Sequence, residues 1–166
     1  VLATGCAVQP YDYSALERSK PRSIVVIPPA NNTVEVNAPY IFLSTISKPL
    51  AEKGYYVFPV SVIDQFLKEN GLPTPAEMNA IPLDKIGEHI GADAVLYVTI
   101  NDWGQKFQVL NSVAVVSATL RLVDVKTGEQ LWDAKAYAEH NPQGNNSGSL
   151  MGALIGAIAE QIAGSL

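Results

Sequence analysis

The sequence predicts an α/β fold, a two-layer or three-layer sandwich around a mixed sheet of five strands. In the first half, short runs of β-branched residues alternate with helical stretches, which favours right-handed crossovers and parallel pairing. In the second half, two long strands flank a good hairpin turn and favour antiparallel pairing. We therefore expect a sheet with a parallel N-terminal half and an antiparallel C-terminal hairpin, with helices on its faces.

The first expected strand is followed by a long helix. Ser23–Ile27 is a β-branched run ended by two prolines, which is typical of a strand buried on both faces. A loop rich in Pro and Asn, residues 28–37, leads to a helix that is expected over Asn37–Lys53, with its first residue as N-cap. Pro49 lies inside this helix and should kink it or split it near Ser47, because proline removes a backbone hydrogen bond.

A second strand and two shorter helices complete the N-terminal half. Tyr55–Val60 is aromatic and β-branched, although Pro59 limits its pairing. Ser61 can cap the helix that follows. One helical turn is expected around residues 76–79, and Leu83–Ile90 is typical of a short helix closed by glycine.

The second half is expected to be mainly antiparallel. Ala94–Ile100 is an apolar strand, and Val109–Val123 alternates apolar and polar residues, which indicates half-burial. In the turn that follows, the carboxylate of Asp124 can accept from the turn amides, while Gly128 takes the left-handed conformation. Glu129–His140 forms the last strand, with one tryptophan and three alanines on a single face.

The C-terminal segment is expected to be a flexible loop, residues 141–149, and a helix over Leu150–Leu166. Gly148, Gly152 and Gly156 recur at four-residue spacing and form a ridge that a second backbone can approach closely. Two interpretations stay open, namely packing of the helix on the sheet and a contact between protomers, for example in a homodimer.

Composition limits the class of protein. With 166 residues, 48% of them hydrophobic and 16% charged, the chain can bury one globular core, which we expect over residues 23–166. A net charge of −5 and only 11 Lys and Arg, scattered along the chain, argue against nucleic-acid binding. One cysteine allows no intrachain disulfide, and no apolar run reaches the roughly 20 residues that span a bilayer.

The single cysteine lies in a distinctive setting near the N-terminus. A signal peptidase that cuts before a lipidated cysteine needs short side chains at the two preceding positions, and Thr4 and Gly5 supply them. The stretch Leu2–Cys6 resembles the lipobox of bacterial lipoproteins, which makes Cys6 the predicted lipid attachment point. Residues 1–22 are therefore expected to be a lipobox remnant and a polar tether, the tether running over residues 7–22. An ordered arm packed on the body is the alternative.

The sequence offers little support for an enzyme. His89 and His140 are the only imidazoles, and neither lies in a metal-binding spacing. No nucleophile elbow, phosphate-binding loop or dinucleotide motif occurs. We therefore predict no catalytic residue, no metal and no cofactor.

Two alternative functions involve a ligand. Asp102 beside Trp103 and Asp133 beside Trp132 could combine an acid pair with an aromatic platform, as in an envelope glycan-binding protein or hydrolase. A weaker alternative is a solute-binding module in which the loop over residues 28–37 acts as a lid.

Two stretches carry a family resemblance, GADAVLYVTINDWG over residues 91–104 and SATLRLVDVKTGEQLWDAKA over residues 117–136. They resemble envelope proteins that include the curli-secretion lipoprotein, the lipoprotein activators of peptidoglycan synthases and the N-terminal domain of the periplasmic Tol-system protein. More closely, the chain is similar to a family of bacterial lipoproteins of unknown function that includes a meningococcal surface-antigen candidate. The amphipathic segments from which the curli protein builds its pore are missing.

The resemblance implies an α/β body on a lipid tether that acts through protein contacts. We expect a non-enzymatic accessory or assembly module of a secretion or transport complex, held at the outer membrane by lipid at Cys6 and facing the periplasm or the cell surface. The implied partners are envelope proteins, such as a curli-secretion-like lipoprotein, and a second copy of the chain.

Overall fold

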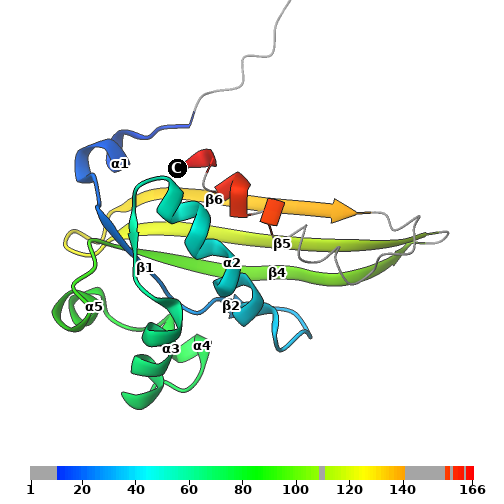
Figure 1. Cartoon of the computed structure of the whole chain (residues 1–166), viewed down its shortest axis with the longest axis horizontal. Helices are drawn as coiled ribbons and strands as arrows, with labels where there is room; N and C mark the ends of the chain where they lie inside the picture. The colour runs from blue at the N-terminus through cyan, green and yellow to red at the C-terminus, as the bar shows by residue number, and fades with distance from the viewer. Residues whose placement is uncertain (1–10, 109–110, 141–155, 158, 163) are drawn as a thin grey trace, which may run out of the picture.

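The computed structural model describes residues 11–108, 111–140, 156–157, 159–162 and 164–166, with only the backbone of residues 105–108, 111–112 and 140. It confirms the predicted α/β fold with a mixed sheet, in the order β3-β1-β4-β5-β6, and adds a short strand, β2, that pairs with β4 (Figure 1). The strands are β1 (Ser23–Val26), β2 (Ala30–Asn31), β3 (Tyr56–Val57), β4 (Ala94–Gln108), β5 (Asn111–Asp124) and β6 (Gln130–His140). The helices that precede and connect these strands are α1 (Ser14–Ser19), α2 (Ala38–Glu52), α3 (Val60–Glu69), α4 (Pro75–Met78) and α5 (Leu83–His89).

The sheet is parallel on one side of β4 and antiparallel on the other. β1 pairs in parallel with both β3 and β4, whereas β4, β5 and β6 follow one another as antiparallel neighbours. β2 continues the line of β1 along β4, because Ala30 lies opposite Thr99. This strand falls in the predicted loop over residues 28–37. Pro28 and Pro29 lie between β1 and β2, and they lack the N–H groups that a continuous hydrogen-bond ladder needs.

Hydrophobic side chains are buried on both faces of the sheet. On one face, α2 packs on alternate residues of β1, β4, β5 and β6, and Ala159 and Ile162 of the C-terminal helical segment join the same cluster (Figure 1). On the other face, α3, α4 and α5 cover β1 and the start of β4. β1 contributes Ile24 to the first cluster and Val25 to the second, which confirms the prediction that it is buried on both sides.

The predicted split of α2 and the predicted length of β3 are wrong. α2 runs without interruption past Ser47 and is not split by Pro49, which lies in its last turn. Proline there removes one backbone bond, and Ile46 and Leu50, both fully buried, hold the flanking turns on the sheet. β3 is limited to two residues, because Pro59 directly precedes the first turn of α3 and ends the pairing.

β4 is much longer than predicted. It continues beyond Ile100 to Gln108, with an irregularity between Ile100 and Asp102 where one extra residue enters the ladder. The bulge reverses the alternation of polar and apolar side chains, so that Trp103 packs against the α2 side. The predicted turn after β5 is confirmed, with a φ of 72° at Gly128 and the side chain of Asp124 accepting from two turn amides.

The expected polar tether contains a structured part. Ser14–Ser19 form α1, which packs beside β6, so the alternative of an ordered arm holds for this part of the chain. The reason is Leu16, whose side chain is 8% exposed and belongs to the α2-side cluster. The predicted flexible loop over residues 141–149 lies outside the described residues.

Candidate functional site

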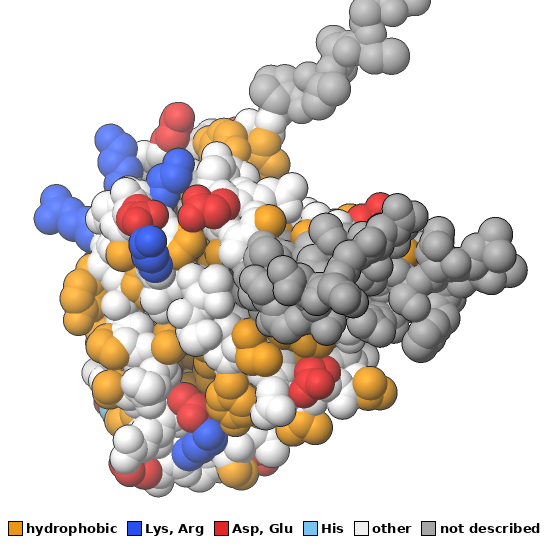
Figure 2. Space-filling model, turned by 45° about the vertical axis from the view of Figure 1, so that its right-hand side comes forward, with side chains coloured by type: hydrophobic (Ala, Val, Ile, Leu, Met, Phe, Trp, Pro, Cys, Tyr) orange, Lys and Arg blue, Asp and Glu red, His pale blue; other side chains and the backbone are white. Residues whose placement is uncertain are grey.

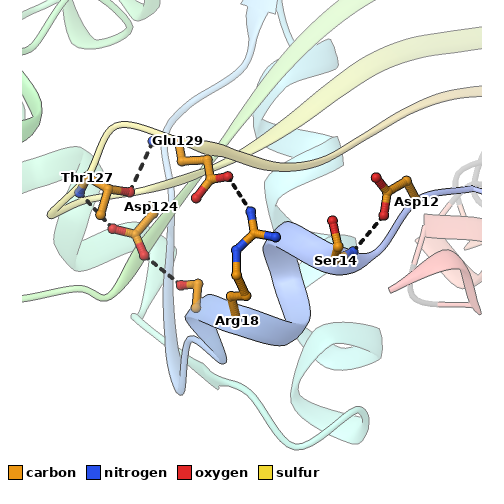
Figure 3. A network of polar contacts seen from close by, with 7 residues as sticks. Asp12, Ser14, Arg18, Asp124, Thr127 and Glu129 are labelled. Atoms are coloured by element: carbon orange, nitrogen blue, oxygen red, sulfur yellow. Dashed lines mark hydrogen bonds and ion pairs between the residues drawn. The ribbon is translucent and has the colours of Figure 1, made fainter.

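An N-terminal arm, residues 11–22, docks on the turn between β5 and β6 (Figure 3). The guanidinium of Arg18 donates to Glu129 at 2.7 Å, and the hydroxyl of Ser19 donates to Asp124 at 2.5 Å. The same Asp124 carboxylate accepts from the N–H groups of Lys126 and Thr127, at 2.9 and 2.8 Å. One carboxylate thus fixes the hairpin turn and holds the end of α1.

Two tyrosines at the start of the arm join it to the edge of the sheet and to the C-terminal segment. The hydroxyl of Tyr11 donates to the carboxylate of Asp133 and accepts from the Asp133 N–H, both at 2.8 Å. The hydroxyl of Tyr13 donates to the carbonyl of Ser165 at 2.9 Å. The arm therefore occupies the beginning of the outer edge of β6.

Apolar burial contributes more to this docking than the ion pair does. The Arg18 and Glu129 side chains are 63% and 46% exposed, and such exposed pairs are worth about 0–1 kcal/mol. Leu16 and Pro21 are buried, and removing a buried leucine side chain typically costs about 2–5 kcal/mol. The arm is thus held mainly by packing, and its polar bonds fix its orientation.

Asp93 connects the end of the arm to the first strand. One carboxylate oxygen accepts from the N–H of Arg22 at 2.9 Å and from the N–H and the hydroxyl of Ser23 at 3.0 and 3.1 Å. These bonds, that of the Arg22 N–H most of all, hold the pKa of Asp93 below its ordinary value. Burial alone would raise the pKa of Asp124, but the bonds from Ser19, Thr127 and Lys126 lower it overall.

Charged side chains gather at the end of the molecule that carries the arm (Figure 2). A hollow at the junction is lined by Lys20, Arg22 and Lys126 together with Asp93 and Asp124. The three cations are exposed, whereas the two carboxylates are half-buried and satisfied by the bonds described above. The exposed charges that line this hollow are therefore positive, although the arm and the turn also carry the exposed acids Glu17 and Glu129.

The sheet leaves a polar face open on β5 and β6. We call the exposed side chains of Thr119, Arg121, Lys135, Tyr137 and Glu139 the polar sheet face; Thr119 lies opposite Lys135 in the ladder. Tyr137 is 55% exposed, and its hydroxyl donates to Glu139 at 2.6 Å, which is the main reason that the pKa of Tyr137 is raised.

The structure does not form the predicted acid and tryptophan site. Trp132 is 1% exposed in the α2-side core, so it offers no platform to a ligand. Asp102 lies opposite Ser117, which donates to it at 2.6 Å, and Asp133 lies opposite Arg121. Those two β5 positions are separated by about 13 Å along the strand. The glycan-binding or hydrolase site with both acids and both tryptophans is therefore wrong.

The other predicted residues are dispersed. His89 is half-exposed on α5, with Glu88 at 3.8 Å, and the side chain of His140 is not described. Across the residues that the structure describes, no group of three or more His, Cys, Asp or Glu side chains could hold a metal ion. No described helix is long and apolar enough to cross a membrane.

Three of the four predicted lipidation and packing residues, Cys6, Gly148 and Gly152, lie outside the described residues. Gly156 belongs to the C-terminal helical segment, and a Cβ placed on it would meet none of the described atoms within 4 Å. Sequence reasoning missed Asp93, although an acidic residue directly before a buried strand was a usable signal. It also missed the solvent-facing cavity between α3, α4 and α5, because that cavity depends on how three separate helices meet.

Comparisons with known proteins extend these observations. The family model described as "Putative lipoprotein GNA1162-like" matches residues 11–166. The chain is 42% identical over 166 residues to "Putative lipoprotein NMB1124/NMB1162" of Neisseria meningitidis serogroup B (strain ATCC BAA-335 / MC58), covering 98% of this chain and 77% of that protein. It is similar to the crystal structure of lipoprotein GNA1162 from Neisseria meningitidis, with a TM-score of 0.73 and 41% identity, over 87% of this chain and 99% of that one.

A more distant likeness shows the fold alone. The PelC dodecamer from Paraburkholderia phytofirmans matches with a TM-score of 0.58 and 17% identity, covering 87% of each chain.

Proposed function

The chain belongs to the GNA1162-like lipoprotein family, and from that membership we propose that it is a bacterial envelope lipoprotein that acts non-enzymatically, through contacts with other proteins. This confirms the family that the resemblance in the sequence predicted. The observation that carries the proposal is the family match over residues 11–166 together with the docked arm. The arm gives a lipid-bearing N-terminus a fixed point of departure from the body.

We propose Cys6 as the lipid attachment point and the outer membrane as the location. Cys6 precedes Tyr11 by five residues, so a lipid there would hold Tyr11 within roughly 18 Å of the attachment point. Lys20, Arg22 and Lys126 lie at the same end of the molecule as the arm. Their positive charge suits an anionic membrane surface, which attracts exposed lysine and arginine at short range.

The proposed partners are other envelope proteins, among them a lipoprotein of the curli-secretion kind in a secretion or transport assembly. The polar sheet face supports this proposal, because it is a broad exposed surface of mixed charge with a half-exposed tyrosine at its centre. Tyrosine and arginine are enriched where proteins meet.

We also propose that the chain associates with itself, with the homodimer as the simplest assembly. The PelC structure is described as a dodecamer, so this fold can support repeated contacts between copies. The predicted ridge of Gly148, Gly152 and Gly156 offers a surface on which two helices can approach closely.

Metabolic labelling tests the anchor. Cells that express the native gene are grown with an alkyne-tagged fatty acid, and the protein is compared with Cys6→Ala and with a matched control, Ser14→Ala, in the described part of the arm. We expect label in the native protein and in Ser14→Ala, and none in Cys6→Ala. Equal labelling of all three, or no labelling of the native protein, would refute lipidation at Cys6.

A further inference from the structure

A cavity of about 450 Å³ opens between α3, α4 and α5, on the side of the sheet away from α2. Its walls are mostly apolar and include Phe66, Leu67, Leu72, Ile81, Ile86 and Ile90. The volume lies in the lower part of the range of small-molecule sites, about 300–1,000 Å³. The neighbouring helices therefore leave a hollow suited to one apolar ligand chain.

One of the helices that form this hollow, α4, is held in place by hydrogen bonds. The amide of Asn79, at the end of α4, donates to the carbonyls of Pro28 and Pro75, at 2.8 and 2.7 Å. Thr74 and Glu77 form a capping box at the start of α4, with bonds of 2.7 to 3.4 Å. α3 and α5 pack in the same hydrophobic cluster as α4. The site is therefore largely formed before a ligand binds, which lowers the cost of ordering it.

The polar groups around the cavity differ in their availability. Asn70 donates its amide to the carbonyl of Phe66 at 2.8 Å, and Glu77 is engaged in the capping box. Lys85 and His89 lie one turn apart on α5, on the same wall as Ile86 and Ile90. The bond from Lys85 to Glu88 is 2.8 Å long, but the two side chains are 53% and 59% exposed, so this pair can open at little cost.

We propose that this cavity binds a medium-chain fatty acid, with its aliphatic chain against the apolar walls of α3 and α5 and its carboxylate at Lys85 and His89. Burial of the chain supplies the binding energy, at about 25 cal/mol per Å² of apolar surface. The ammonium of Lys85 supplies a charge-assisted bond to the carboxylate and selects an anionic head group. A single chain fits this volume, whereas a phospholipid would bring two.

The first test is a titration of the full chain, carrying Cys6→Ala, with decanoate below its micelle concentration. We expect saturable one-to-one binding in calorimetry, with a negative heat-capacity change, and shifts of the Ile81, Ile86 and Ile90 methyl resonances. Decyltrimethylammonium, which has the same chain and a positive head, should bind at least about tenfold more weakly. No saturable binding of decanoate, or equal affinity for both head groups, would overturn the proposal.

Variants locate the site. Ala80→Trp places a large side chain at the exposed rim of the cavity and should abolish decanoate binding, while Lys85→Glu should weaken it about tenfold. Lys48→Glu is the matched control, because Lys48 is 83% exposed on α2 and away from the cavity, and it should bind like the parent. If Ala80→Trp fails to fold, the decanoate affinity of Lys85→Glu alone tests the site. Parental affinity in a folded Lys85→Glu would refute the assigned head-group site.

The outcome of the decanoate titration does not depend on whether Cys6 carries a lipid. The titration uses a chain without Cys6, so a failure of fatty-acid labelling leaves this proposal standing, and a failure of the titration leaves the anchor standing.

Discussion

At the scale of single residues, two carboxylates connect segments that are distant in the sequence. Asp93 accepts three bonds from Arg22 and Ser23, and Asp124 connects α1 to the hairpin turn. Hydrogen bonds to a charged acceptor contribute more than neutral ones, about 1.5–3 kcal/mol each. Both groups have a lowered pKa, so both should make stability depend on pH.

Asp93→Asn should make the stability of the fold less sensitive to acid pH. A carboxylate whose pKa is lower in the folded state stabilises the fold above its ordinary pKa of about 4, and this contribution is lost as the pH falls below that value. Asparagine keeps an acceptor in place but not the charge. We expect Asp93→Asn to lose about 1 kcal/mol at pH 7 and to show a shallower fall of melting temperature between pH 5 and pH 3.

Exposed Asp84→Asn serves as the control for this comparison and should follow the native curve. Parallel curves for the native protein and Asp93→Asn would show that the charge of Asp93 does not stabilise the fold.

At the scale of elements, the arm is held to the body by few buried side chains. It contributes one buried leucine, and most of its polar bonds lie at the surface. Segments with few buried apolar contacts open locally at a low free-energy cost. The docking of the arm should therefore be sensitive to one side chain.

Leu16→Ala should release the arm. The loss of its packing, about 2 kcal/mol, should raise the population of the open arm and speed tryptic cleavage after Arg18 by more than tenfold. Mass spectrometry of timed digests measures the rate. Glu17→Ala alters the exposed neighbour and should be cut at the native rate. Equal rates for all three proteins would show that Leu16 does not hold the arm.

At the scale of the whole molecule, one sheet divides the protein into two differently covered sides. α2 and the C-terminal helical segment pack on one side, and α3, α4 and α5 cover only part of the other (Figure 1). The arm marks one end, and the polar sheet face lies on β5 and β6, on the same side of the sheet as the three small helices but on other strands. The molecule thus separates its proposed points of anchoring, partner contact and ligand binding.

Self-association should depend on the glycine ridge. We expect the native chain to have the mass of a dimer in light scattering and Gly152→Leu to have that of a monomer, because leucine prevents close approach of two backbones. Gly164→Leu is the matched control, since Gly164 lies near the exposed end of the same segment and a Cβ there meets no described atom within 4 Å. A native monomer, or a Gly152→Leu dimer, would contradict the proposed contact.

Much of the fold could be predicted from local patterns. The buried strand at Ser23–Ile27, the turn at Asp124–Gly128 and the mixed character of the sheet follow from burial periodicity and turn chemistry, which act between near neighbours. The family could also be predicted, because its marker residues are contiguous in the sequence. Local signals misjudged Pro49, because packing of α2 on the sheet outweighed one lost backbone bond.

The sequence by itself determined the fold class, the family and the candidate anchor Cys6, because each depends on residues close together along the chain. Only the tertiary structure decided that the arm docks on the hairpin turn, that Trp132 is buried away from Asp102, and that an apolar cavity opens between three helices. These features join residues many positions apart. They depend on how separate helices and strands pack against one another. The periodicity of residues within one helix or strand does not specify that packing.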